Sequence, residues 1–80
     1  MRSPRNISAR QLITALKKFG YEETRQKGSH IRLTTSLDGI HHETIPNHDY
    51  IKIGTLQAIL KSIASHHNLT VQQLIQKLKL

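Results

Sequence analysis

Apolar residues in the N-terminal part of the chain recur every three or four positions. Between residues 8 and 20 they stand at Leu12, Ile13, Leu16 and Phe19. This spacing places them on one face of a helix. Ser8 and Gln11 fit a capping box at its start, and Gly20 stands where a glycine that ends a helix is expected. The pattern therefore predicts a first helix with one buried face.

The same periodicity predicts two more helices in the C-terminal part. The longer one begins at Gly54-Thr55 and ends at His66-His67-Asn68. Its apolar face consists of Leu56, Ile59, Leu60 and Ile63. Thr70 and Gln73 fit a second capping box, which starts a short helix. The inward side chains of that helix are Val71, Leu74, Ile75 and Leu78.

Between the first and second helices, apolar and polar residues alternate, which is typical of strands. Residues 30–35 are the clearest case, with Ile31, Leu33 and Thr35 on one face and His30, Arg32 and Thr34 on the other. Residues 21–26 and 41–45 predict weaker strands, the latter stopped by a proline at position 46. Turns are expected at Gly28 and at Asp38-Gly39.

The order of these elements predicts an α+β fold, α-β-β-β-α-α, with a three-stranded antiparallel sheet and helices packed on one face. The register of the third strand stays open, because Ile45 requires the core face and Glu43 would then share it. A chain of 80 residues, 36% of them hydrophobic, makes one small domain. We assign residues 8–80 to that domain and expect residues 1–7, with Pro4 and two arginines, to form a flexible basic arm.

Composition narrows the classes of protein. The chain has no cysteine, which excludes disulfides and thiolate metal sites. No apolar run approaches the ~20 residues of a membrane span, and no secretory signal is visible, so we expect a cytoplasmic protein. The six histidines include no helical His-x-x-x-His pair, so neither metal nor cofactor is expected. His41 and His42 should point to opposite faces, and His66 and His67 should favour the dipole at a helix end.

Net charge is the strongest global signal. Twelve basic residues against five acidic ones give +7 with the histidines neutral, and nucleic acid is the first partner that such a balance indicates. The aromatic residues are too few for a stacking platform that reads single-stranded RNA: Phe19, Tyr21 and Tyr50.

The segment 25–30, Arg-Gln-Lys-Gly-Ser-His, contains more charge than a turn requires. A turn needs Gly28 and Ser29, whereas two cations beside His30 repel one another unless an anion lies between them. A turn at Lys27-Gly28 would put Arg25 opposite His30, and a turn at Asp38-Gly39 would put His30 near Pro46. We therefore expect this segment and the corner 46–48 to meet at one end of the sheet.

Such a site suits cleavage of the RNA backbone. Histidine titrates near neutrality, so His30 can act as the base or the acid, while Arg25 and Lys27 stabilise charge on the phosphate. Further candidates for RNA or phosphate contacts are Gly28, Ser29, Arg32, His48 and Lys52. A turn cap is the alternative role for His48, and an ordinary helix start is the alternative for Lys52.

Four blocks of sequence carry a resemblance: Gly20-Tyr21, residues 25–30, Ile45-Pro46-Asn47-His48, and Gly54-Thr55-Leu56 with Ile59-Leu60. In order and spacing the chain resembles the HicA toxin family from Ser8 to about Leu78. The resemblance implies a double-stranded-RNA-binding-domain-like fold and a ribosome-independent mRNA interferase that cleaves single-stranded RNA without metal. It places the catalytic histidine at His30. It also implies a type II toxin of the stress response, neutralised by a HicB-type antitoxin that covers the catalytic face.

The chain departs from the family pattern in its arm, at residues 34–37 and at His41-His42-Glu43, which affects substrate preference and the match to an antitoxin. Two other functions stay open. One is a module that binds RNA through the same surface without cleaving it. The other is a DNA-binding helix-turn-helix made by the last two helices, with Gln72, Gln73 and Gln76 reading adenine. Because Gln73 already serves as a cap and the last helix is short, we expect no direct DNA binding.

Overall fold

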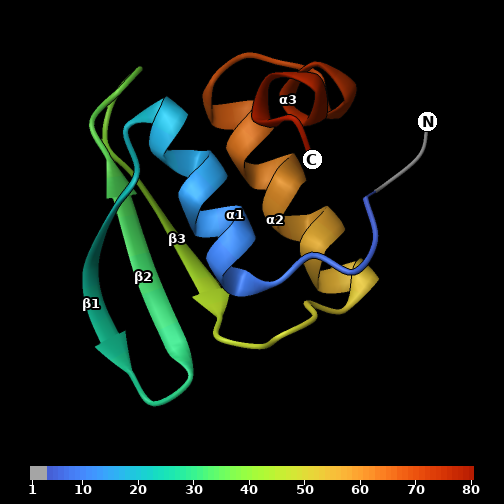
Figure 1. The fold of residues 1–80 in the computed structure, drawn as a ribbon. Helices are drawn as coiled ribbons and strands as arrows, with labels where there is room; N and C mark the ends of the chain where they lie inside the picture. Colours follow the sequence, from blue (N-terminus) through green and yellow to red (C-terminus); the bar gives the residue numbers. More distant parts are fainter. Residues whose placement is uncertain (1–3) are drawn as a thin grey trace.

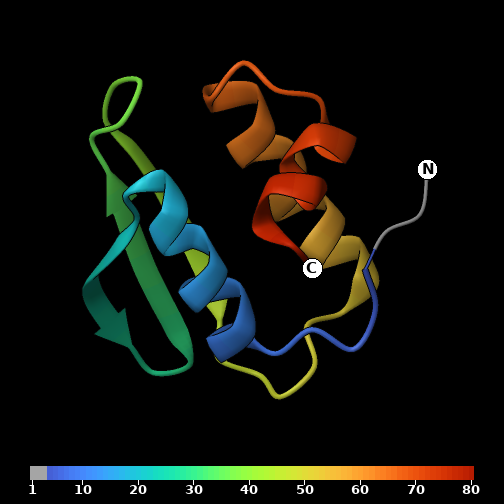
Figure 2. The same cartoon turned by 45° about the horizontal axis from the view of Figure 1, so that its top comes forward.

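The computed structural model describes residues 4–80, which fold into a sheet covered by helices on one face (Figures 1 and 2). The elements are, in order, α1 (Ala9–Leu16), the 3-10 helix η1 (Lys17–Phe19), β1 (Glu22–Lys27), β2 (His30–Thr35), β3 (His41–Pro46), α2 (Ile53–His66) and α3 (Val71–Leu78). The three strands are antiparallel in the order β1-β2-β3. The predicted α+β fold class, with its double-stranded-RNA-binding-domain-like arrangement, is confirmed.

Capping fixes the starts of two helices. In α1 the Gln11 amide donates to the Ser8 hydroxyl over 3.1 Å, and the Ser8 amide donates to the Gln11 side chain over 2.9 Å. Thr70 and Gln73 make the same pair of bonds before α3, so both predicted capping boxes are confirmed. The longer predicted helix, α2, begins at Ile53, one residue before the expected Gly54, and has no side-chain cap.

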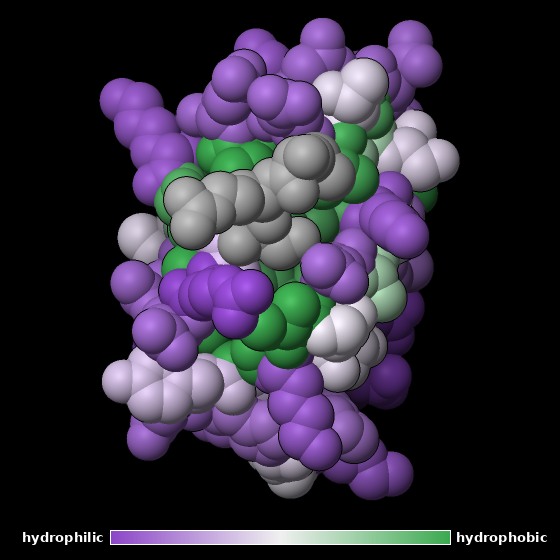
Figure 3. All heavy atoms as spheres, turned by 90° about the vertical axis from the view of Figure 1, so that its right-hand side faces the viewer, coloured by the Kyte–Doolittle hydropathy of each residue, from purple (hydrophilic) through white to green (hydrophobic). Residues whose placement is uncertain are grey.

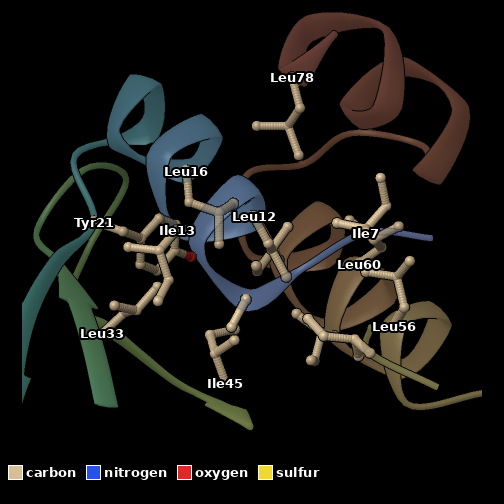
Figure 4. Packing of buried hydrophobic residues seen from close by; sticks show 14 of the residues in the cluster. Ile7, Leu12, Ile13, Leu16, Tyr21, Leu33, Ile45, Leu56, Leu60 and Leu78 are labelled. Atoms are coloured by element: carbon tan, nitrogen blue, oxygen red, sulfur yellow. The ribbon is translucent and has the colours of Figure 1, made fainter. Parts of the chain in front are cut away.

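The core lies between the inner face of the sheet and the three helices (Figure 4). Ile31, Leu33 and Ile45 point inward from the strands and are fully buried. Every residue of β1 is exposed, which explains why the pattern of that strand is weak in the sequence. On the side away from the sheet, hydrophobic residues reach the surface between hydrophilic ones (Figure 3), as is common when a domain is too small to enclose its apolar surface.

The register between β1 and β2 corrects one expectation. The turn lies at Gly28-Ser29, one residue later than the expected Lys27-Gly28, so Lys27 lies opposite His30 and Arg25 lies opposite Arg32. The prediction that Arg25 faces His30 across the hairpin is therefore wrong. The position of the turn is the reason, since the alternation of this polar strand does not encode it. A β-bulge between Glu23 and Arg25 shifts only the pairing of the residues before Arg25.

The register between β2 and β3 agrees with the expectation, with His30 opposite Pro46. It also decides the open question about the third strand. Ile45 is buried, and Glu43 shares its face, where the Ser62 hydroxyl of α2 donates to the Glu43 carboxyl over 3.3 Å.

The N-terminal segment is tied to the domain before α1 begins. Residues 1–3 of the expected arm lie outside the described residues. Ile7 is buried in the core, and its carbonyl accepts a hydrogen bond from the Ile51 amide at 2.9 Å. The Ala9 amide donates to the His48 carbonyl over 3.0 Å. Ile7 therefore belongs to the packed domain, next to the loop that leads into α2.

Replacement of Gly20 by alanine is expected to lower the free energy of unfolding by about 1–3 kcal/mol. Gly20 has φ +79°, and a Cβ there would meet the Thr35 hydroxyl oxygen at 2.8 Å. That hydroxyl donates to the Phe19 carbonyl over 2.6 Å and accepts from the Leu37 amide over 3.0 Å, so it has little freedom to move. Urea denaturation measures the loss.

Gly28→Ala is the matched control for that variant. Gly28 also has positive φ, +59°, but a Cβ there meets no atom within 4 Å. Both variants share the backbone strain, so only Gly20→Ala adds the clash. Equal losses in the two variants would contradict the role of Gly20 as a close-packing position.

Among residues 4–80 there is no helix with the length and hydrophobicity needed to cross a membrane.

Candidate functional site

A shallow hollow lies on the face of the sheet that is turned away from the helices. It measures about 210 Å³ and is lined by Arg25, Lys27, His30, Arg32 and Thr44. The alternation of β2 explains this placement, because its inward residues are buried and its outward residues, which include His30, are open to solvent. Four of the five lining residues stand in β1 or β2, and Thr44 comes from β3.

The strand register brings the lining residues together. Lys27 pairs with His30, and Arg25 pairs with Arg32, so two cross-strand pairs stand one after the other along the hairpin. Thr44 pairs with Arg32 from the other side. Thr44 is not among the site residues predicted from the sequence, although its alternation with Ile45 in β3 indicates an outward side chain.

The turn between β1 and β2 is joined to the corner after β3. The Ser29 carbonyl accepts a hydrogen bond from the Asn47 amide at 2.6 Å, and the His48 amide donates to the Pro46 carbonyl over 2.8 Å. Gly28 at the tip is exposed, and its positive φ of 59° suits a tight turn. The backbone of the corner 46–48 therefore meets this turn, as the sequence predicts.

Two candidate residues stand apart from the lining of the hollow. The side chain of His48 is exposed and does not line it. Lys52 is also exposed and immediately precedes α2, where it occupies the N-cap position without a side-chain bond. The structure thus groups Arg25, Lys27 and Arg32 around His30 and leaves His48 and Lys52 outside.

Electrostatically, the hollow is a cluster of positive charge. Within residues 4–80, the contacts of a carboxylate with a basic side chain at ion-pair distance are Arg10 with Glu23 and His67 with Asp38, so no carboxylate neutralises the cations that line the hollow. Like charges on neighbouring strands destabilise a sheet. An anion bound between them relieves that repulsion, which makes a phosphate group the natural ligand of this surface.

A second cluster of polar side chains stands at the opposite end of the sheet, and the sequence did not indicate it. His41 Nδ1 and His67 Nε2 lie 2.7 and 3.2 Å from the Tyr21 hydroxyl, and His67 Nδ1 lies 2.9 Å from a carboxylate oxygen of Asp38. His66 Nε2 donates to the Gly39 carbonyl over 2.9 Å. The expectation that His66 and His67 serve only the helix dipole is therefore wrong.

Burial shapes this second cluster. It raises the pKa of the Tyr21 hydroxyl and of the Glu43 carboxyl, and it lowers the pKa of His41. Within the described part of the chain, no group of three or more His, Cys, Asp or Glu side chains is arranged to hold a metal ion.

The sequence of the chain was compared with models of protein families. Residues 9–64 match the HicA toxin of bacterial toxin–antitoxin systems. The chain belongs to the HicA toxin family. The match extends from α1 through the whole sheet to most of α2, and it includes every residue that lines the hollow. This HicA-family protein is accordingly the toxin of a toxin–antitoxin pair, with an antitoxin as its partner.

A search of curated proteins and a search of solved structures each returned no match.

Proposed function

We propose that this HicA-family toxin is an endoribonuclease, an mRNA interferase that cleaves single-stranded RNA without metal, with His30 as its catalytic residue. One observation carries the proposal: His30 lies in an open hollow among Arg25, Lys27 and Arg32, and no carboxylate of the described residues forms an ion pair with these cations. A titratable imidazole beside several cations suits phosphodiester cleavage, because it can transfer a proton while the cations stabilise charge on the phosphate. We propose messenger RNA as the substrate class, in line with what the resemblance to the family implies.

The reaction that suits these groups is an attack by the ribose 2′-oxygen. A bond forms between that oxygen and phosphorus, and the bond from phosphorus to the 5′-oxygen of the next nucleotide breaks. A base takes the proton of the 2′-hydroxyl, and an acid gives a proton to the leaving 5′-oxygen. The products are a 2′,3′-cyclic phosphate and a 5′-hydroxyl. His30 takes part in one or both proton transfers, since imidazole exchanges protons near neutral pH.

The cations act on the phosphate. Negative charge grows on the non-bridging oxygens as the 2′-oxygen attacks, and fixed donors aimed at those oxygens stabilise the transition state. Arg25 and Arg32 face one another across the hairpin, so their guanidinium groups reach the same phosphate from two strands. Lys27 pairs with His30, so its ammonium group can bind the RNA backbone beside the reacting phosphate. Gly28 and Ser29 leave the approach to the turn open, while Lys52 extends the positive surface beyond the hollow and His48 adds an exposed hydrogen-bonding side chain.

The double variant Arg25→Gln/Lys27→Gln is expected to bind RNA less tightly and with a weaker salt dependence. Loss of two phosphate contacts should reduce the slope of log affinity against log salt by about 1.4, because each contact to a single strand contributes about 0.7. Fluorescence anisotropy with a labelled RNA at several salt concentrations measures the slope.

Lys61→Gln/Lys77→Gln is the matched control, since it removes the same charge from exposed positions on α2 and α3. The control should retain the wild-type slope within error. An equal reduction in both variants would mean that RNA responds to net charge alone and would contradict a binding role for the hollow.

The proposed activity is tested with purified protein, a long single-stranded RNA and EDTA. We expect fragments from the RNA, and none from an RNA of the same sequence in which every ribose is 2′-O-methylated and lacks the nucleophile. Binding without cleavage of either RNA would contradict the proposal and favour a non-catalytic RNA-binding module. Cleavage of both would exclude the 2′-hydroxyl as the nucleophile.

The antitoxin is proposed to be of the HicB type and to cover the hollow in the cytoplasm, where mRNA is available. A partner that buries Arg25 and Arg32 must supply negative charge, since buried cations are costly without a counterion. Titration of the antitoxin into the cleavage reaction should stop it at the stoichiometry of the complex. Continued cleavage in the saturated complex would contradict coverage of this face.

A further inference from the structure

The end of the sheet opposite His30 contains an unbroken chain of hydrogen bonds. We name it the histidine relay: Asp38, His67, Tyr21, His41, Ser62 and Glu43. His41 pairs with Thr35 at the far end of β2, whereas His30 pairs with Pro46 at the near end. The relay therefore does not share a residue with the hollow, and it stands independently of the proposed function.

Five links make up the relay. From Asp38 to Glu43 the heavy-atom distances are 2.9 Å (carboxylate to His67 Nδ1), 3.2 Å (His67 Nε2 to Tyr21 hydroxyl), 2.7 Å (Tyr21 hydroxyl to His41 Nδ1), 3.3 Å (His41 Nε2 to Ser62 hydroxyl) and 3.3 Å (Ser62 hydroxyl to Glu43 carboxyl). The links connect the β2–β3 turn, the residue before β1, β3 and α2. Every member except the two ends is a group that donates on one side and accepts on the other.

That property allows the relay to be fully bonded in two ways. In the first, protonated Glu43 donates to Ser62, Ser62 donates to His41 Nε2, His41 Nδ1 donates to Tyr21, and Tyr21 donates to His67 Nε2. In the second, all four of these bonds are reversed, so Glu43 is ionised and His67 has a proton on both nitrogens. His67 Nδ1 donates to the Asp38 carboxylate in both. The second arrangement arises from the first when each donor passes its proton along, so no proton is gained or lost.

We propose that the histidine relay holds one proton in common between Glu43 and His67 and acts as a pH-dependent clamp that fastens the β2–β3 turn to α2. If a further proton enters, two donors must face each other at one link. If the shared proton leaves, two acceptors must face each other. Either change removes a hydrogen bond from a partly buried site, and an unsatisfied polar group there destabilises the fold.

The side chains around His41, the central histidine of the relay, come from α2, from β3 and from Tyr21. The ring of His66 from α2 is stacked on it, with 4.5 Å between centroids, and Tyr21 contacts it edge-on and through a hydrogen bond. His67 is bonded to the same Tyr21 hydroxyl. His42 is its neighbour along β3, and Glu43 faces α2 two residues further on.

Burial lowers the pKa of His41 and raises that of Glu43, with His66, His67 and His42 adding to the effect on His41. Both shifts favour the neutral forms of these side chains. The unfolded chain binds more protons at His41 below pH about 6.5, so stability falls there as pH falls. The folded chain retains a proton at Glu43 above its ordinary pKa, so stability falls as pH rises through that interval. The two effects oppose each other, so His41 and Glu43, taken as independent groups, lower stability at mildly acidic pH.

Nitrogen-15 NMR of the histidine side chains tests the shared proton directly. We expect the ring nitrogens of His41 and His67 to change their protonation together, over one pH range, in the wild-type protein. Tyr21→Phe removes the central hydroxyl but keeps the ring, and it should uncouple the two residues. Tyr50→Phe is the matched control, because Tyr50 is exposed and lies outside the relay. In Tyr50→Phe, the ring nitrogens of His41 and His67 should still change their protonation together, as in the wild type.

Thermal unfolding gives the second readout. Loss of the central hydroxyl should lower Tm by about 4–8 °C at the pH where the measured Tm of the wild type is highest, and by less at more acidic and more alkaline pH. Ser62→Ala provides a second variant with a milder change: His41 and His67 stay coupled, but the titration of Glu43 no longer affects His67. Independent titration of His41 and His67 in the wild type would overturn the proposal. So would a Tm difference between wild type and Tyr21→Phe that does not vary with pH.

Discussion

Replacement of His30 by alanine is expected to slow RNA cleavage by about 10²–10⁴-fold, the usual contribution of a side chain that transfers a proton in the transition state. RNA affinity should change little, because the cations around His30 remain. The fold should also remain, since the side chain of His30 is exposed. The loss would thus be one of rate, with binding and structure retained.

Single-turnover rates on one RNA, with affinity measured at the same salt concentration, separate rate from binding. His42→Ala is the matched control: His42 is an exposed histidine of β3 that pairs with Thr34, at the other end of the same sheet. Its rate should stay within about twofold of wild type, since surface substitutions usually have small effects. If the two alanine variants cleave at equal rates, His30 has no part in the chemistry.

Replacement of Leu12 by alanine is expected to reduce the free energy of unfolding by about 2–5 kcal/mol. Leu12 is fully buried, and it points from α1 into the core (Figure 4). Alanine removes its apolar contacts and leaves a cavity that the surrounding sheet and helices cannot fill completely. Small domains have a total stability of about 5–15 kcal/mol, so this loss is a large part of the total.

Urea denaturation followed by far-ultraviolet circular dichroism measures that loss. Thr14→Ala on the exposed side of the same helix serves as the control and should change stability by no more than about 0.5 kcal/mol. Similar midpoints for the two variants would contradict the position of Leu12 at the centre of the core.

The sequence predicts those features that depend on neighbouring residues. Both capping boxes are local patterns, and they identify the starts of α1 and α3 correctly. The alternation in β2 predicts which face His30 occupies, because a strand with buried Ile31 and Leu33 has a single possible orientation. The meeting of the β1–β2 turn with the corner after β3 follows from the same register.

Other features depend on contacts between distant segments. The turn at Gly28-Ser29 sets the partner of Arg25, and a strand with no buried residue gives no apolar pattern from which to fix its register. The histidine relay joins Tyr21, Asp38 and His67, which stand in three separate segments. Only the packing of the β2–β3 turn against the end of α2 brings them together, so six scattered histidines gave no indication of it.

The chemical identity of the fragment ends is the most direct test of cleavage by the ribose hydroxyl at this site. Mass spectrometry of the products from wild-type protein, a defined RNA and EDTA reads both ends of the broken bond. The account predicts a 2′,3′-cyclic phosphate, or the 2′- or 3′-phosphate from its hydrolysis, on one fragment and a 5′-hydroxyl on the other. A 3′-hydroxyl with a 5′-phosphate would mean that water attacked the phosphorus and would contradict it.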